Sequence, residues 1–145
     1  MWEKLNKGIV ISHSPYSCII FSISALEKLQ KITNKKMNKC ESGGLLLGFI
    51  RGNHFDVRDI TIPYKNDLSS PSLFVRRDKN HLDFFKTLQK KNKDITYIGE
   101  WHTHSENNPR PSSIDLHEWD LIKSIRPYPI VFLILGKKDF YITVK

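Results

Sequence analysis

The chain has 145 residues, with 23 lysines and arginines against 15 aspartates and glutamates, which gives a net charge of +8. This length predicts one domain, residues 1–145, that buries about two-thirds of its unfolded surface. No apolar run is long enough to cross a bilayer and the start does not resemble a signal peptide, so we expect a cytoplasmic protein with no membrane partner. Positive charge favours acidic partners, but the basic residues are scattered and no RNA-recognition, KH or zinc-finger motif accompanies them, which argues against nucleic acid.

The first part of the chain predicts two short strands and a helix. Residues 8–12 and 18–21 are expected to be extended, and residues 24–34 to be helical, with Ser22 or Ser24 as the cap. The predicted helix has one apolar face, formed by Ala25, Leu26, Leu29 and Ile32.

A hairpin and an irregular segment are expected next, after a polar loop over residues 35–42. The apolar run 43–50 is typical of a buried central strand, and residues 54–62 pair with it across a short turn. Residues 63–71 contain two prolines and several turn-forming residues, so they predict an irregular, mobile loop, followed by extended residues 73–76.

A second helix is predicted to start at Asp78 and to end in a lysine-rich stretch before Asp94. Its expected apolar stripe consists of Leu82, Phe85 and Leu88. Residues 95–104 then form a predicted strand, and the turn 105–111 leads into a third helix.

The chain ends with two predicted strands, at residues 130–135 and 140–144, which pair around a turn. Taken in order, the elements predict an α+β fold, with a central mixed sheet flanked by about three helices.

The clearest chemical signal is a set of two histidines and one carboxylate. His102 and His104 lie on the predicted strand, where alternate side chains point to the same face, so both imidazoles can reach one ion. Ser112 follows after seven residues, and Asp115 after two more. Three protein ligands leave a fourth position free on a tetrahedral zinc, which is the arrangement of catalytic sites. The pattern therefore predicts one open zinc site per chain.

Ser112 and Asp115 also form a capping-box pattern, which alone would explain both residues as the start of the third helix. A cap does not account for two histidines on one strand face directly upstream, and a residue in the first helical turn can also point toward a metal. The four other histidines are expected to be packed or surface residues, including His117, which lies round the helix from Asp115.

Other zinc signatures are missing. The sequence has no H-E-x-x-H motif, none of the H-x-E and P-C-x-x-C pair of nucleobase deaminases, and no C-x-x-C, since Cys18 and Cys40 are single and far apart. The predicted site therefore uses nitrogen and oxygen ligands.

These residues resemble the signature of the JAMM, or MPN-type, metallopeptidases: an upstream glutamate, then His-x-His, seven residues, Ser, two residues and Asp. The glutamate matches Glu41, which precedes a glycine-rich strand entry at Gly43 and Gly44. The resemblance covers nearly the whole chain and implies the JAMM (cytidine-deaminase-like) fold. It departs from the family at Ser105, where a proline often follows the second histidine, and this concerns the substrate groove more than the metal.

By this resemblance, His102, His104 and Asp115 are the zinc ligands, Glu41 is the general base and Ser112 helps to hold the oxyanion. Zinc lowers the pKa of its bound water to about 7 and polarises the scissile carbonyl. A carboxylate beside that water can take its proton and pass it to the leaving amine. A hydroxyl that donates to the oxyanion contributes on the order of 3 kcal/mol. By itself, Glu41 would be an ordinary surface glutamate in a polar loop.

The compact length, the residues Gly99, Glu100 and Trp101 before the first histidine, and Trp119 after the last are similar to bacterial JAMM proteins of anti-phage (CBASS) operons. This similarity implies a deconjugase that cuts the bond between the C-terminus of a nucleotidyltransferase or ubiquitin-like protein and a lysine or peptide of its target. The implied partners are that conjugate and the operon's E1- and E2-like enzymes. The alternatives are a JAMM protease that trims a ubiquitin-like or sulfur-carrier tail, and a non-catalytic basic domain that binds nucleic acid or protein.

Overall fold

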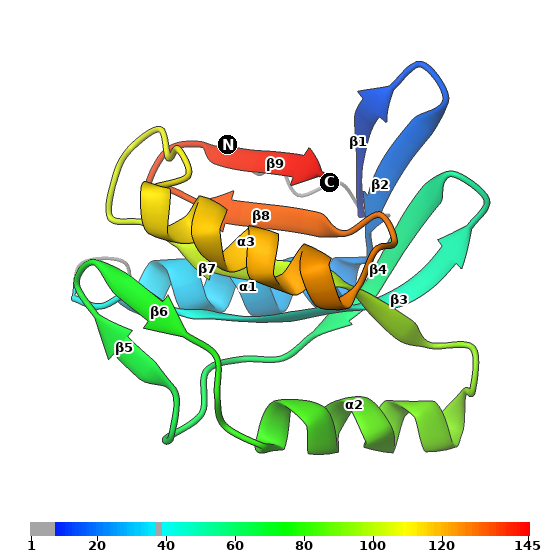
Figure 1. Ribbon diagram of the computed structural model, residues 1–145, viewed down its shortest axis with the longest axis horizontal. Helices are drawn as coiled ribbons and strands as arrows, with labels where there is room; N and C mark the ends of the chain where they lie inside the picture. Colours follow the sequence, from blue (N-terminus) through cyan, green and yellow to red (C-terminus); the bar gives the residue numbers. More distant parts are fainter. Residues whose placement is uncertain (1–7, 37–38) are drawn as a thin grey trace.

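The structure is a computed structural model that describes residues 8–36 and 39–145. In this part of the chain, seven strands form one mixed sheet, in the order β1-β2-β4-β3-β7-β8-β9 (Figure 1). The strands are β1 (Ile9–Ser14), β2 (Ser17–Phe21), β3 (Gly43–Arg51), β4 (His54–Ile60), β7 (Thr96–Thr103), β8 (Val131–Leu135) and β9 (Phe140–Val144). The pairs β2–β4 and β7–β8 are parallel, and the other neighbours are antiparallel.

Three helices accompany the sheet: α1 (Ile23–Lys36), α2 (Asn80–Lys91) and α3 (Ser113–Ile125). Helices α1 and α3 lie on opposite faces of the sheet, and α2 lies to one side (Figure 1). Within the described residues the elements agree with the predicted α+β fold. No helix among these residues is long and apolar enough to span a membrane.

Strand β8 shows how the two faces of the sheet are filled. Val131, Leu133 and Leu135 belong to the core cluster that includes Ala25 and Leu29 of α1. Phe132 and Ile134 alternate with them and pack with Trp119 of α3 on the other face. All five residues of the strand are buried, which is why the sequence shows a continuous apolar run here and not an alternating pattern.

Helix α1 forms as its sequence predicts. Ala25, Leu26 and Leu29 are buried against the sheet, and Ile32 packs at the margin of the same core. The Ser22 hydroxyl accepts a hydrogen bond from the Ala25 backbone N–H at 3.2 Å, which satisfies one of the free donors of the first turn. Ser22 is therefore the cap, and not Ser24.

The predicted apolar stripe of α2 is partly wrong. Leu82 is 51% exposed, whereas His81, which we expected to be an ordinary packed or surface histidine, is completely buried. The His81 ring lies 2.5 Å from the Thr61 hydroxyl through Nδ1 and 2.7 Å from the Asp67 carboxylate through Nε2. Helical periodicity could not reveal this, because the partners of His81 come from other segments of the chain.

The prediction of an irregular loop over residues 63–71 is also partly wrong. Residues Leu68–Ser70 form strand β5, which pairs with β6 (Leu73–Val75) in a separate two-stranded sheet. We refer to residues 68–75 as the β5–β6 hairpin. It turns around Pro71 and Ser72, and its two strands satisfy each other's backbone groups in spite of the turn-forming composition. The extended conformation predicted for residues 73–76 is confirmed over β6.

Candidate metal centre

His102 lies near the end of β7 and His104 directly follows the strand, and both side chains point to the same face, as extended backbone geometry requires. Their Nε2 atoms are 3.1 Å apart. Thr103 points to the opposite face, where its hydroxyl accepts a hydrogen bond from the Ser42 backbone N–H at 2.9 Å. The Thr103 N–H in turn donates to the Ser42 carbonyl at 2.8 Å. The same strand end therefore presents two imidazoles on one face and, through Thr103 and Ser42, holds the neighbouring segment that contains Glu41.

Asp115 reaches the histidines from the first turn of α3. Its Oδ1 lies 3.2 Å from His102 Nε2, and its Oδ2 lies 3.1 Å from His104 Nε2. The capping box is also present: the Ser112 hydroxyl accepts from the Asp115 N–H, and the Asp115 carboxylate accepts from the Ser112 N–H. The same Asp115 carboxylate thus caps the helix and contacts both histidines. The hydrogen bonds of the cap fix the direction in which the carboxylate points.

The three side chains have the geometry of a metal-binding set. The corners of a tetrahedron around zinc, with bonds of about 2.0–2.1 Å, are separated by roughly 3.3 Å. The two Nε2 atoms are 3.1 Å apart and each lies 3.1–3.2 Å from one of the two carboxylate oxygens, and one ligand atom from each residue lies within 4.8 Å of the others. Two imidazole nitrogens and a carboxylate that converge in this way need a cation or an extra proton between them. His102, His104 and Asp115 therefore fit a zinc ion, and exposed His117 is not one of the group.

Glu41 lies beside this set, although it precedes His102 by 61 positions in the sequence. Its Oε1 is 3.9 Å from His104 Nε2, and the residue is only 8% exposed. Burial raises the pKa of the Glu41 carboxyl above its ordinary value, although the two imidazoles offset part of this effect. A buried carboxylate with a raised pKa at this distance from the histidines is suited to accept a proton.

The β5–β6 hairpin holds the backbone of Glu41 in place. The Glu41 N–H donates to the Ser70 carbonyl at 2.8 Å, and the Ser69 hydroxyl donates to the Glu41 carbonyl. Close packing continues directly after this residue: a Cβ added to Gly43 would lie 2.4 Å from the Phe74 ring, and one added to Gly44 would lie 2.2 Å from the Thr61 carbonyl oxygen. The glycine-rich entry to β3 is therefore required because neither position has room for a side chain.

Electrostatics within the set favour an ionised carboxylate. Burial would raise the pKa of Asp115, but hydrogen bonds from His102, His104 and the Ser112 N–H lower it far below the usual range. For His104 the signs are reversed. Burial by itself would lower its pKa, but the nearby Asp115 and Glu41 carboxylates outweigh burial and raise the pKa above its ordinary value. The His104 Nδ1 is buried without a hydrogen-bond partner in the described structure, and the nearest carboxylate, that of Glu106, is 3.7 Å away.

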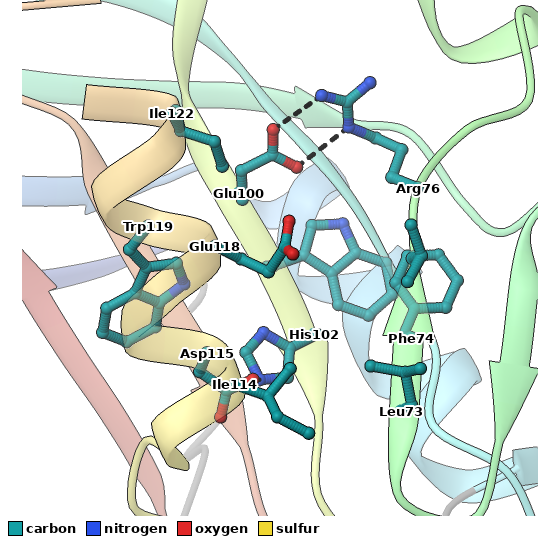
Figure 2. A pocket seen from close by; sticks show the side chains of 12 residues that line it. Leu73, Phe74, Arg76, Glu100, His102, Ile114, Asp115, Glu118, Trp119 and Ile122 are labelled. Atoms are coloured by element: carbon teal, nitrogen blue, oxygen red, sulfur yellow. Dashed lines mark hydrogen bonds and ion pairs between the residues drawn. The ribbon is translucent and has the colours of Figure 1, made fainter. Parts of the chain in front are cut away.

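We refer to His102, His104 and Asp115 as the metal set. A groove runs from the metal set along α3. It encloses about 160 Å³ between α3 and β6, above β7 (Figure 2). Its apolar lining includes Leu73, Phe74, Trp101, Ile114, Trp119 and Ile122. Arg76 and Glu100 form a two-pronged ion pair at the far end, with N–O distances of 2.9 and 2.8 Å. No local pattern predicts most of these residues, because their common position depends on the packing of β6 against α3 and β7.

Comparison with known proteins points to one family. Residues 28–142 match the model of the prokaryotic homologues of the JAB domain. A protein of Escherichia coli strain TW11681 named CD-NTase/cGAS isopeptidase is 32% identical over 97% of this chain and 90% of its own length. Proteins of the same name from Pseudomonas aeruginosa and Vibrio cholerae are 34% and 35% identical, over 84% and 72% of this chain and 79% and 67% of their own lengths.

The fold has a solved counterpart. A solution structure of a Desulfitobacterium hafniense protein superimposes with a TM-score of 0.58 and 20% identity, over 87% of this chain and 82% of that protein. Together with the α+β architecture and the family match, this confirms the expected fold. The resemblance to the JAMM, or MPN-type, proteins is likewise confirmed: the chain belongs to the family of prokaryotic JAB-domain proteins.

Proposed function

We propose that this protein is a zinc-dependent isopeptidase that reverses E1/E2-like conjugation in bacterial antiviral defence. The observation that carries the proposal is the convergence of His102, His104 and Asp115 within 3.1–3.2 Å of one another, with the buried Glu41 carboxylate beside them. The names of the relatives, which describe isopeptidases for CD-NTase/cGAS proteins, support the substrate class.

In this proposal His102, His104 and Asp115 hold the zinc. The ion supplies a water molecule of lowered pKa and a Lewis acid for the scissile carbonyl. Glu41 takes the proton from the attacking water at its carboxylate and passes it to the leaving amine nitrogen as the carbon–nitrogen bond breaks. The Ser112 hydroxyl accepts a bond from the Asp115 N–H, and it can still donate its own proton to the oxyanion.

The proposed substrate is a CD-NTase joined through its C-terminus to a lysine or peptide of a target protein. The amide bond after that C-terminus is cut, and the E1- and E2-like enzymes that made it are the functional partners. The reaction takes place in the cytoplasm, and residues 1–145 act as one catalytic domain.

The ligand assignment is tested by metal analysis. Purified protein should contain about one zinc per chain, and His102→Ala and Asp115→Ala should each lose it. His117→Ala is the matched control, because this histidine is exposed on α3 outside the set, and it should keep its zinc. Full zinc occupancy in both ligand variants would overturn the assignment.

The catalytic assignment is tested with Glu41→Gln, which preserves the size of the side chain. This variant should keep its zinc and its fold but cleave an isopeptide-linked CD-NTase conjugate at least about a hundredfold more slowly, since general base catalysis contributes roughly 10²–10⁴ in rate. Cleavage within a few-fold of the wild-type rate would remove the general-base role from Glu41 and leave the zinc site untouched.

A further inference from the structure

The groove beside the metal set carries one negative charge without a partner. Glu118 lines the groove and is exposed, and no ion pair or hydrogen bond engages its carboxylate in the described structure. Figure 2 shows this side chain reaching from α3 into the groove, between His102 and the Arg76–Glu100 pair. The other charges of the groove are already compensated.

Arg76 illustrates that compensation. Its guanidinium binds both oxygens of Glu100, and Glu100 also accepts a hydrogen bond from the Tyr97 hydroxyl at 3.0 Å. A bidentate pair of this kind leaves little net charge for a ligand. Asp115 faces the two histidines, so the remaining charge that a substrate meets along the groove is that of Glu118.

The position of Glu118 on α3 relates it to the site of cleavage. It follows Asp115 by three residues, so both side chains project from the same face of the helix, about 4.5 Å apart along its axis. An extended peptide advances about 3.3 Å per residue. A substrate chain that leaves the metal set along the groove therefore passes Glu118 within one to three residues of the scissile bond.

The groove walls suit a long side chain with a charged end. Phe74, Ile114 and Ile122 line the groove with apolar surface around the carboxylate. Lysine and arginine cover such surface with their aliphatic stems while their charged ends reach a polar group. On the leaving side of an isopeptide bond, the group next to the nitrogen is an uncharged lysine stem. A cationic side chain near the bond is therefore on the acyl side.

We infer that Glu118 selects conjugates whose C-terminal tail carries a lysine or arginine within three residues before the scissile bond. This inference rests on the proposed isopeptidase function. It adds that the protein distinguishes its substrates by the charge of their C-terminal tails. A tail with an acidic residue at that position meets Glu118 with a like charge and is rejected.

The test uses quenched isopeptide substrates that differ at one position. Each of the last three tail positions is occupied in turn by lysine, norleucine, glutamine or glutamate, and kcat/KM is measured for the zinc-loaded protein. At one of these positions we expect lysine to exceed glutamate by about tenfold, because a partly exposed ion pair and the opposing repulsion each contribute a few-fold. Glu118→Lys should reverse this order, and Glu118→Gln should abolish it.

Asp120→Lys is the matched control. Asp120 is exposed on the same helix but does not line the groove, so this variant makes the same change in net charge and should keep the wild-type order. Binding of the free tail peptides, followed by the fluorescence of Trp101 and Trp119 in the groove wall, should show the same preference without cleavage.

The possible failures are distinct. Efficient cleavage with no charge preference, or a preference that is the same in Glu118→Lys, would overturn the role of Glu118 and leave the isopeptidase intact. Failure of the zinc-loaded wild type to cleave any substrate would count against the proposed function, and equal binding of lysine and glutamate tails would then overturn the inference by itself.

Discussion

At the scale of single residues, His104 stands out because one of its two ring nitrogens is buried without a hydrogen-bond partner in the described structure. Its Nε2 faces His102 and Asp115, whereas its buried Nδ1 has no partner in the described structure. A histidine that binds metal through one nitrogen usually donates its other N–H to a carboxylate or carbonyl, which fixes the tautomer and the ring orientation. Glu106 lies 3.7 Å from Nδ1, slightly beyond hydrogen-bond distance, and its side chain is 58% exposed. A small rotation would complete the contact.

We therefore expect Glu106→Ala to weaken zinc binding by about 10- to 100-fold, the usual effect of losing such an outer contact. The affinity is measured by competition with a chromophoric chelator. Glu27→Ala, a change at an exposed glutamate of α1, is the control and should leave the affinity unchanged. If both variants bound zinc as the wild type does, Glu106 would not orient the ligand.

Among the elements, the β5–β6 hairpin links Glu41 to a buried polar network that contains Asp67, His81 and Thr61. Its strand β5 holds the Glu41 backbone, and its base is fixed by Asp67, which accepts hydrogen bonds from the backbone N–H groups of Tyr64, Arg77 and Asp78. Asp67 also binds His81, which contacts Thr61, and the Thr61 carbonyl accepts from Trp101 Nε1 at 3.0 Å. The hairpin is thus tied to the sheet next to His102.

This network makes a prediction about stability and pH. Burial would raise the pKa of Asp67, but its hydrogen bonds from Tyr64, Asp78, His81 and Arg77 outweigh burial and lower the pKa. A pKa below the unfolded value of about 3.9 means that ionised Asp67 stabilises the fold above that pH. This contribution is lost as the pH falls through the folded-state pKa.

Asp67→Asn should therefore reduce the free energy of unfolding at pH 7 by about 1–3 kcal/mol. The difference from the wild type should begin to shrink below about pH 4, where the carboxyl of the unfolded chain is protonated, and should disappear once the pH lies below the lowered folded-state pKa of Asp67. Urea unfolding of the two metal-free proteins between pH 3 and pH 7 measures this. Exposed Asp94→Asn should show no comparable effect; an Asp67→Asn difference that did not vary with pH would contradict the role of the ionised carboxylate.

For the whole molecule, the metal set joins distant parts of the fold. His102 and His104 come from the end of a central strand, and Asp115 comes from the helix that covers one face of the sheet. An unfolded chain does not hold these groups together, so the proposed zinc ion would bind the folded state and stabilise it by mass action.

Zinc at about 1,000 times its dissociation constant should add roughly 4 kcal/mol to the stability. For a chain of this length, that corresponds to an increase in Tm of about 10 °C. Thermal unfolding with zinc and with a chelator measures the difference. His102→Ala should show almost no increase in Tm with zinc. An increase equal to that of the wild type would mean that zinc stabilises the protein by binding at another site.

The sequence by itself determined the features that depend on neighbours along the chain. The alternation of a strand places His102 and His104 on one face, and the capping box fixes Asp115 in the first turn of α3, because both relations act over a few residues. The β3–β4 hairpin belongs here too: its turn contains Gly52, whose φ of 59° suits glycine. Glu41 was placed by family resemblance, since nothing in its own loop distinguishes it from a surface glutamate.

Only the tertiary structure decided the features that join distant segments. Strand β5 was missed because turn-forming residues there are compensated by pairing with β6. The contacts of buried His81 were not predictable because its partners, Thr61 and Asp67, lie in the segment between β4 and β5. The groove that contains Glu118 exists because β6, β7 and α3 pack together. Periodicity reports which face of an element is apolar, but not which polar groups the folded chain brings into contact with it.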